Sequence, residues 1–323
     1  MNILVLCSPD TAEAQRELSG HNLFLVLDLS QSTHGLQPTA VLLLDFMYDQ
    51  DLNTALRHLP DVIAFAEQVR RDHGPIDRVI SFNEATHYLA AEIRERFGIR
   101  GDDRRAAARY RDKWVMYQRF RDAGLPAPRT RLLPPGTTEI TGMADMIVIK
   151  PREQAASRGV QLMPRRDWRG GHTRTDLLVQ DRVDGDYYHF DAAFRNGVLV
   201  YCAVNRYLYH GLDWASGQAP MASVTEQRPE RHTRAVNLVN QLGKAFEVGN
   251  QVLHIEAFWV PTQDDFTFIE LANRPGGALI VAANIVAGNL NLEAESIRDT
   301  ITAVTGVIDL PSSDRMRLSS KSV

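Results

Sequence analysis

The sequence is poor in cysteine and lacks long hydrophobic runs. Its two cysteines, Cys7 and Cys202, lie far apart and without the spacing of metal ligands, which excludes a disulfide scaffold and favours a reducing compartment. No apolar run approaches the length of a membrane span. The segment 1–6 is too short, and lacks the basic residues, for a signal peptide. These absences predict a cytoplasmic protein with no membrane partner.

The sequence also lacks a large excess of charge of either sign. The 36 basic and 40 acidic residues are mixed along the chain, with a net charge of −4. Because no basic stripe could follow a nucleic-acid backbone, we exclude nucleic acid as a partner. A Gly-x-Gly-x-x-Gly turn is missing after the first predicted strand, where residues 7–11 read Cys-Ser-Pro-Asp-Thr. This argues against a dinucleotide-binding dehydrogenase.

What is present is a chain of 323 residues, long enough for about two domains. Its first hundred residues alternate predicted strands and helices, a pattern typical of a parallel sheet with crossover helices. Ligands of such sheets bind beyond the carboxyl ends of the strands, so Asn83 and Glu84 are candidates for a substrate wall. The alternative is a helix cap followed by an ordinary first-turn acid. The predicted strands are 3–6, 23–29, 40–44 and 78–82, and the predicted helices are 60–71 and 84–97.

A predicted β-hairpin near the C-terminus sets two carboxylates face to face. In a register symmetric about residue 263, Glu256 lies opposite Glu270. Like charges in such a pair repel, and a cation between them removes the repulsion. Oxygen ligands of this kind suit Mg²⁺ bound together with phosphates, whereas the alternative is a solvated acidic face. The hairpin strands are 252–260 and 266–271, and the same register pairs Ile255 with Leu271 and Ala257 with Ile269.

The segment after the hairpin can receive an anion. Arg274 is a permanently charged fork suited to phosphate or carboxylate, and Gly276, in a pair of glycines, allows close approach of the backbone. The order Glu-x-x-x-Arg-x-Gly-Gly, after His-x-Glu on the preceding strand, resembles the metal-binding end of the ATP-grasp superfamily of carboxylate–amine ligases.

Two segments upstream are similar to the same family. Residues 110–128 predict a helix with Asp112 as N-cap, and they resemble the family's Asp-Lys…Gly-x-Pro-x-Pro segment, whose lysine reaches the nucleotide phosphates. Here that lysine is Lys113. The strand 146–149 stops at Lys150, before a small-residue loop that resembles the family's phosphate-covering loop and contains Ser157 and Gly159. The alternative for each lysine alone is an ordinary surface charge.

The resemblance places the adenine-binding hinge after the strand that ends at Gln180. It implies that the backbone of Asp181 to Val183 contacts the adenine edge, and that Leu271 contacts the nucleotide. The family has Glu where Gln180 stands, and a second, ribose-binding Glu where Tyr187 stands. The ribose ligand therefore stays open.

The resemblance also implies the metal ligands. Glu256 and Glu270 correspond to the family's carboxylate ligands. Many members have Asn two residues after the second Glu, where this chain has Ala272, so Asn273 is the candidate for a third ligand although it lies on the opposite face of a continuing strand. His254 shares a strand face with Glu256. It could contact a phosphate oxygen, and the alternative is a purely structural histidine.

An aromatic, glycine-containing loop at residues 207–221 is the predicted substrate pocket. Arg206 stands at its base and, with Arg274, could clamp a carboxylate during catalysis.

Together these features predict the ATP-grasp fold, an α/β (α+β) architecture. Its expected parts are an N-terminal parallel-sheet domain (1–108), a nucleotide-binding lid (109–190) and a C-terminal antiparallel-sheet subdomain with the metal and substrate site (191–323). Residues 317–323 predict a polar tail.

The resemblance implies a cytoplasmic ligase that uses ATP with Mg²⁺, or Mn²⁺ in its place, to form an amide from a carboxylate, of an amino acid or small peptide, and an amine through an acyl phosphate. Acyl loading onto a carrier-protein thiol and a non-catalytic ATP-binding sensor are the alternatives, and a homodimer stays open.

Overall fold

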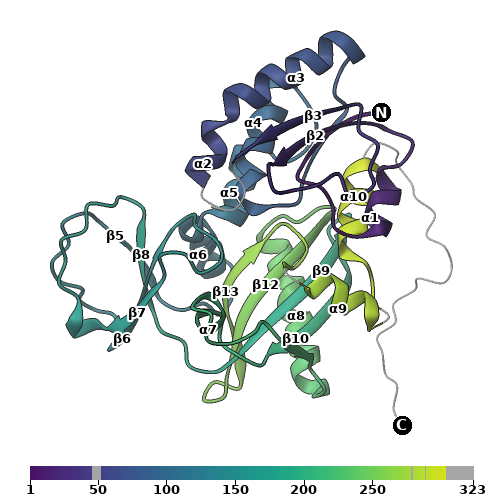
Figure 1. Ribbon diagram of the computed structural model, residues 1–323. Helices are drawn as coiled ribbons and strands as arrows, with labels where there is room; N and C mark the ends of the chain where they lie inside the picture. The colour runs from purple at the N-terminus through teal and green to yellow at the C-terminus, as the bar shows by residue number, and fades with distance from the viewer. Residues whose placement is uncertain (46–51, 278, 288, 303–323) are drawn as a thin grey trace.

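The computed structural model describes residues 1–45, 52–277, 279–287 and 289–302 (Figure 1). Within these ranges the strands form a parallel four-stranded sheet, an antiparallel four-stranded sheet and an antiparallel five-stranded sheet. This confirms the predicted α/β architecture with an antiparallel C-terminal sheet. No helix in these ranges is both long and apolar enough to cross a membrane. The predicted tail 317–323 lies outside the described residues.

The N-terminal sheet has the order β3-β2-β1-β4 and purely parallel pairing, as predicted. Strand side chains alternate between faces, so Leu4 and Leu6 pack with α3 and α4, whereas Ile3 packs with Ala294 and Ile297 of α10 on the other face. The last described helix thus returns to the first sheet. The elements are β1 (Asn2–Leu6), α1 (Ala12–Leu18), β2 (Asn22–Asp28), β3 (Ala40–Leu44), α2 (Leu52–Arg57), α3 (Leu59–His73), β4 (Arg78–Ser81), α4 (His87–Phe97) and α10 (Leu292–Thr302).

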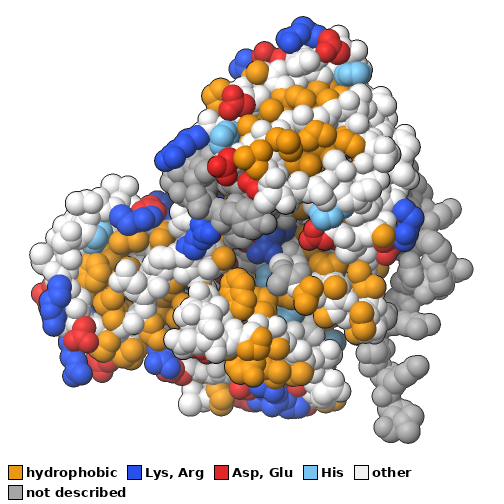
Figure 2. All heavy atoms as spheres, in the orientation of Figure 1, with side chains coloured by type: hydrophobic (Ala, Val, Ile, Leu, Met, Phe, Trp, Pro, Cys, Tyr) orange, Lys and Arg blue, Asp and Glu red, His pale blue; other side chains and the backbone are white. Residues whose placement is uncertain are grey.

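A hydrophobic patch lies on the edge strand β3. Val41 and Leu43 are exposed there, and Leu29 is exposed nearby (Figure 2). Unpaired edges with apolar side chains are places where a second chain can pair. The homodimer stays a prediction, for which this patch is the first surface to examine.

The predicted helix 84–97 is divided into the short 3₁₀ turn η1 (Glu84–Thr86) and α4. Asn83 caps it as predicted: its Oδ1 accepts from the Ala85 amide at 2.9 Å, and its carbonyl accepts from the Thr86 amide at 3.0 Å. The second bond spans three residues instead of four, which tightens the first turn. Glu84 is thereby held at the carboxyl end of β4.

Asp112 joins helices α5 (Arg104–Arg111) and α6 (Lys113–Asp122). Its carboxylate accepts from the Trp114 amide at 2.9 Å and forms an ion pair with Arg152, so the predicted N-cap is confirmed. Gly124 follows the helix with a φ of +65°, a left-handed conformation that glycine adopts without strain. The cap places Lys113 in the first turn of α6.

The second sheet, with the order β5-β8-β6-β7, forms the lid at the left of Figure 1. Its small core includes Ile147, Ile149 and Val179. The predicted strand 146–149 is longer than expected, because Lys150 and Pro151 still pair with β8. The elements are β5 (Thr130–Leu133), β6 (Met146–Pro151), β7 (Gln161–Pro164), η2 (Arg165–Asp167) and β8 (Leu177–Asp181).

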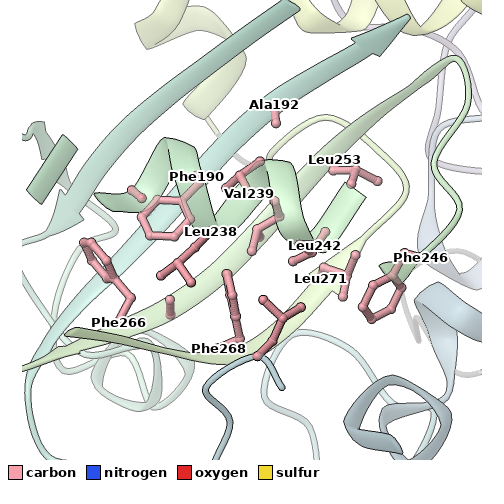
Figure 3. Packing of buried hydrophobic residues seen from close by; sticks show 14 of the residues in the cluster. Phe190, Ala192, Leu238, Val239, Leu242, Phe246, Leu253, Phe266, Phe268 and Leu271 are labelled. Atoms are coloured by element: carbon pink, nitrogen blue, oxygen red, sulfur yellow. The ribbon is translucent and has the colours of Figure 1, made fainter. Parts of the chain in front are cut away.

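The third sheet has the order β11-β10-β9-β12-β13 and carries the largest core. Helix α8 covers one face, where Leu238 and Val239 pack with Phe190 and Phe268 (Figure 3). The predicted boundary at residue 190 falls inside β9. The elements are β9 (Asp186–Arg195), β10 (Val198–Tyr207), α7 (Gly211–Ala215), β11 (Ser223–Thr225), α8 (Pro229–Ala245), β12 (Gln251–Val260), β13 (Asp265–Ala272) and α9 (Ile280–Val286).

The predicted hairpin is formed by β12 and β13. Its register pairs Glu256 with Glu270 and Ile255 with Leu271, as expected. The predicted pair of Ala257 with Ile269 is wrong, because a β-bulge after Glu256 shifts the register and pairs Ala257 with Phe268. Ile269 is then free to line the cavity described below.

We expect Phe268→Ala to lower the free energy of unfolding by about 3–5 kcal/mol, because the ring is fully buried and its removal leaves a cavity. Urea denaturation of the purified protein measures this difference. The control is Val198→Ala on β10, where the side chain is exposed and the expected change stays within about 0.5 kcal/mol. Equal effects of the two substitutions would contradict the assigned core.

Candidate active site

A cavity of about 820 Å³ lies between the lid and the five-stranded sheet. This volume is in the range of small-molecule sites. Strands β6 and β8 contribute to one side, and β9, β12 and β13 contribute to the other. The predicted site residues that line it are Glu84, Lys113, Lys150, Ser157, Gln180, Asp181, Val183, Tyr187, His254, Glu256, Glu270, Leu271 and Arg274.

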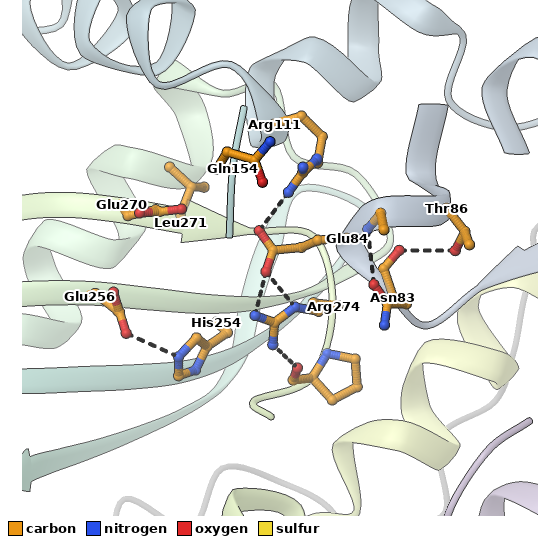
Figure 4. Close-up of polar contacts among 12 residues, drawn as sticks. Asn83, Glu84, Thr86, Arg111, Gln154, His254, Glu256, Glu270, Leu271 and Arg274 are labelled. Atoms are coloured by element: carbon orange, nitrogen blue, oxygen red, sulfur yellow. Dashed lines mark hydrogen bonds and ion pairs between the residues drawn. The ribbon is translucent and has the colours of Figure 1, made fainter. Parts of the chain in front are cut away.

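Glu256 and Glu270 line this cavity, and His254 lies beside Glu256 (Figure 4). Lys113 Nζ lies 2.8 Å from Glu270 Oε1, and His254 Nε2 lies 3.8 Å from Glu256 Oε1. Burial alone would raise the pKa of Glu256, but His254 and a hydrogen bond from Tyr187 hold it below its ordinary value. Two ionised carboxylates fit the oxygen donors that Mg²⁺ takes together with phosphates.

Two buried lysines face the same cavity. Lys113 Nζ also donates to the Gln154 carbonyl at 2.5 Å, which ties α6 to the loop after β6. The pKa of Lys150 is lowered to about 8, chiefly by burial, which Glu270 opposes and the nearby Lys113 reinforces. An anion between the two ammonium groups would relieve their repulsion. That the two lysines bind phosphate stays a prediction.

Two histidines share the buried carboxylate of Asp191. His254 Nδ1 lies 2.8 Å from Asp191 Oδ1, and His189 Nδ1 lies 2.7 Å from Oδ2. Burial alone would lower the pKa of His254, but Asp191 raises it to about 9. The three side chains are close enough to hold a metal ion together. The Nδ1 atoms of both histidines already contact Asp191. The effect of the group is to keep His254 charged beside Glu256.

Glu84 is held between two arginines. Its Oε2 accepts from Arg274 Nε at 3.0 Å and Nη2 at 2.5 Å, and its Oε1 accepts from Arg111 Nη1 at 3.0 Å. Burial alone would raise the pKa of Glu84, but Arg274 and Arg111 hold it well below its usual range. Glu84 borders the cavity, yet both its oxygens are occupied. In this structure Glu84 orients Arg274, and its contact with substrate stays a prediction.

The predicted hinge borders the cavity, but two of its side chains are engaged elsewhere. Gln180 Nε2 donates to Thr130 Oγ1 at 2.8 Å, and Asp181 Oδ1 accepts from the Ala144 amide at 2.7 Å. Asp181 also pairs with Arg129 at 2.8 Å. These contacts tie the hinge to the lid sheet. The amides of Asp181 and Arg182 are engaged as well, with the carbonyls of Arg129 and Met146. The hinge carbonyl groups and the Val183 amide are therefore the backbone groups that stay candidates for a nucleotide base.

Tyr187, at the ribose-binding place of the family, belongs to an aromatic group. Its ring stacks at centroid distances of 4.8 Å on Tyr207, 4.8 Å on Phe258 and 5.4 Å on His210. Burial and the nearby Glu256 carboxylate raise the pKa of Tyr187, so its hydroxyl stays protonated. Asp186, beside it, pairs with Arg231 at 3.1 Å.

The loop after β6 bends back over that strand. Ser157 lines the cavity in a left-handed conformation, with a φ of +57°. Gly159 has a φ of +69°, and a Cβ atom there would lie 3.0 Å from Pro151 Cγ. Glycine is needed at this position because the backbone lies so close to the end of β6. Gly159 is not among the cavity-lining residues of the described chain, so it shapes the loop.

The structure places two predicted residues away from the cavity. Tyr207, on β10, lines the cavity. Because neighbouring residues of a strand point to opposite faces, Arg206 lies on the other face of β10, which α8 covers. The prediction that Arg206 clamps a carboxylate with Arg274 is therefore corrected. Asn273 Nδ2 donates to Asp102 Oδ2 at 2.9 Å, behind the sheet, so it is not directed at the carboxylate pair as a third metal ligand.

Gly276 packs inward. A Cβ atom there would lie 2.6 Å from Ile280 Cγ2 and 2.9 Å from Asp191 Oδ1, so no larger residue fits. Its neighbour Gly277 lines the cavity instead. Gly276 is therefore not open to an anion, and the close approach predicted for the glycine pair stays a prediction, for Gly277 only.

Sequence reasoning missed Arg111 and the Asp191 group. A signal for the latter was present, because His-x-acid occurs twice, at His189–Asp191 and at His254–Glu256. The two motifs lie on adjacent antiparallel strands, β9 and β12. The histidine of each motif pairs with the acid of the other: His254 is opposite Asp191, and Glu256 is opposite His189. Arg111 directly precedes the Asp-Lys pair, but only its burial reveals its role.

Comparison with known proteins identifies this arrangement. Residues 110–277, just over half of the chain, match the family described as the ATP-grasp domain. The chain belongs to the ATP-grasp family. No curated protein matches its sequence.

Solved structures share the ATP-grasp fold with this chain at low identity. An L-amino acid ligase from Bacillus licheniformis is 14% identical with a TM-score of 0.68, over 93% of this chain and 74% of that one. A carboxyaminoimidazole ribonucleotide synthase from Aspergillus clavatus, complexed with ATP, is 13% identical with a TM-score of 0.68, over 97% and 78%. The biotin carboxylase domain of a Hydrogenobacter thermophilus 2-oxoglutarate carboxylase, with MgADP and bicarbonate, is 14% identical with a TM-score of 0.64, over 97% and 72%.

We expect Glu84→Gln to lower the free energy of unfolding by about 3–5 kcal/mol at pH 7, because it leaves two arginines without their shared carboxylate. The folded-state pKa of Glu84 is depressed, so its contribution is present above pH 4.5 and declines as the pH falls toward the folded-state value. Urea denaturation at pH 7 and pH 4 measures both differences.

The matched control is Glu67→Gln, which breaks the exposed pair with Arg96 and should cost about 0–1 kcal/mol. A loss for Glu84→Gln that is the same at both pH values would contradict the charged, buried pairing.

Proposed function

We propose that this ATP-grasp protein is an ATP-dependent ligase that joins a carboxylate, of an amino acid or a small peptide, to an amine. The observation that supports this proposal is the convergence in one cavity of a carboxylate pair, two lysines and an arginine. Each group suits a different part of the reaction. The absence of a disulfide between Cys7 and Cys202 is in keeping with a cytoplasmic reaction.

The side chains divide the reactants between them. Lys113 and Lys150 bind the phosphates of ATP, and the hinge backbone between Asp181 and Val183 binds the base. Glu256 and Glu270 would hold Mg²⁺, or Mn²⁺ in its place, which would supply positive charge to neutralise the transferred phosphoryl group.

Arg274 binds the substrate carboxylate. One carboxylate oxygen attacks the γ-phosphorus, and the bond from that phosphorus to the β,γ-bridging oxygen breaks, which gives an acyl phosphate and ADP. The amine then attacks the acyl carbon, the bond from that carbon to the phosphate oxygen breaks, and inorganic phosphate leaves as the nitrogen loses a proton. Positioning and charge neutralisation by the lysines and Arg274 account for the catalysis.

Glu84 has an indirect part in this reaction. A guanidinium that is fixed at Nε and Nη2 by a buried carboxylate can present its remaining edge in only one orientation. Arg274 Nη1 donates to the Pro275 carbonyl at 2.8 Å, which further limits its movement. Arg274 is therefore preorganised for an anion before any substrate arrives.

Measurement of ADP and phosphate release in the presence of ATP and Mg²⁺ tests this function, with amino acids, dipeptides and bicarbonate as separate carboxylate arms. We expect an amino acid or dipeptide to stimulate release, and Arg274→Lys to remove the stimulation while ATP binding persists, because Lys lacks the fork. Stimulation by bicarbonate alone would overturn the assigned substrate. ATP binding without stimulation in any arm would favour a sensor, and transfer to a carrier-protein thiol would favour acyl loading.

We expect Glu270→Gln to reduce turnover by about 100- to 1,000-fold, because it removes one of two metal-binding carboxylates. The fold should persist, since the change lessens the repulsion with Glu256 and Lys113 keeps its hydrogen bond to the Gln154 carbonyl, which thermal unfolding of the variant checks. The matched control is Glu139→Gln at an exposed position of the lid, which should keep full activity. Turnover of Glu270→Gln at the parent rate, with the same Mg²⁺ dependence, would refute the ligand assignment.

A further inference from the structure

Arg111 connects two parts of the active site without lining its cavity. It is the last residue of α5, its side chain is fully buried, and it is not among the described residues that line the cavity. Its Nη1 donates to Glu84 Oε1 at 3.0 Å (Figure 4). Its Nη2 donates to the main-chain carbonyl of Glu153. One guanidinium therefore contacts both the carboxylate that orients Arg274 and the segment after Lys150.

The main chain of that segment is held at three successive carbonyl groups. The Lys113 amide donates to the Arg152 carbonyl at 3.0 Å, and Lys113 Nζ donates to the Gln154 carbonyl at 2.5 Å. Arg111 holds the carbonyl between them, that of Glu153. Because these donors come from the adjacent ends of α5 and α6, the segment is fixed to the two helices as well as to its own lid sheet.

The loop 154–160 that follows depends on such support. Ala156 and Ser157 have φ values of +52° and +57°, a left-handed conformation that is unfavourable for residues with a side chain. Conformations of this kind persist where the surrounding contacts fix the chain. Ala155, Ala156 and Ser157 all line the cavity, so the position of the anchored carbonyl sets how they face a bound ligand.

The alternative role of Arg111 is only to neutralise Glu84. A positive charge alone would meet that need, and lysine would supply it. A guanidinium differs from an ammonium group because its two terminal nitrogens donate in fixed directions, so it can hold a carboxylate and a carbonyl at once. The two roles therefore differ in the expected effect of Arg111→Lys.

We propose that Arg111 is a positioning residue for the phosphates of ATP. By holding the Glu153 carbonyl, it fixes the start of the loop 154–160 against α5, and its ion pair with Glu84 keeps the guanidinium in place for this contact. The inference rests on the proposed function, since it takes the phosphates to lie beside this loop. Arg111 acts through the main chain and touches no reacting group.

Calorimetric titration of the full chain in the presence of Mg²⁺ tests the inference, with the non-hydrolysable ATP analogue AMP-PNP and with AMP as separate probes. We expect Arg111→Lys to raise the Kd of AMP-PNP about tenfold, because a charge-assisted hydrogen bond to the loop is lost. The Kd of AMP, which lacks the β- and γ-phosphates, should stay within about twofold, whereas general damage to the fold would weaken both nucleotides. Thermal unfolding checks the fold of each variant.

A second variant acts on the same contact from the other side. Glu153→Gly keeps the Arg111–Glu84 ion pair but loosens the main chain at the anchored carbonyl, so it should raise the Kd of AMP-PNP similarly. It serves if Arg111→Lys does not fold. The matched control is Arg109→Lys on the same helix, where the arginine also contacts a carboxylate and a carbonyl, those of Glu247 and Phe246. This control should leave both Kd values unchanged.

The outcomes separate this inference from the proposed function. If the parent protein binds AMP-PNP and Arg111→Lys binds it equally well, the inference alone is overturned. The same holds if AMP is weakened to the same degree, or if Arg274→Lys weakens AMP-PNP as much as Arg111→Lys, since the effect would then pass through Glu84. If the parent protein does not bind AMP-PNP, the proposed function fails together with the inference.

Discussion

The buried carboxylate of Glu84 holds together three segments that are far apart in the sequence. It belongs to the 3₁₀ turn after β4, and its two oxygens accept from Arg111 at the end of α5 and from Arg274 after β13. Each charge in this group would be costly to bury alone, so the three are stable only together. Through Arg274 the N-terminal sheet helps to define the active-site cavity, although most of the cavity lies between the other two sheets.

The same requirement, that each buried charge has a partner, shapes the rest of the cavity. Lys113 compensates Glu270, and Asp191 keeps His254 charged beside Glu256. The aromatic stack on Tyr187 excludes water from one side, which strengthens these interactions. The cations balance the carboxylates when the cavity holds no ligand.

Consecutive residues after β13 lie on opposite sides of the sheet. Asn273 was expected at the metal, but it donates to Asp102 away from the carboxylate pair, while the next residue, Arg274, lines the active-site cavity.

Local patterns in the sequence determined the parallel N-terminal sheet, the Asn83 and Asp112 caps and the Glu256–Glu270 pair, because capping and strand alternation depend on residues close in the chain. They could not determine the partners of Glu84, the direction of Arg206 or the bulge that turns Ile269 toward the cavity. These depend on which segments meet in space and on how buried charges are compensated there. Only the tertiary structure decides such contacts, because no local spacing specifies that Glu84 pairs with Arg111, 27 residues away, and with Arg274, 190 residues away.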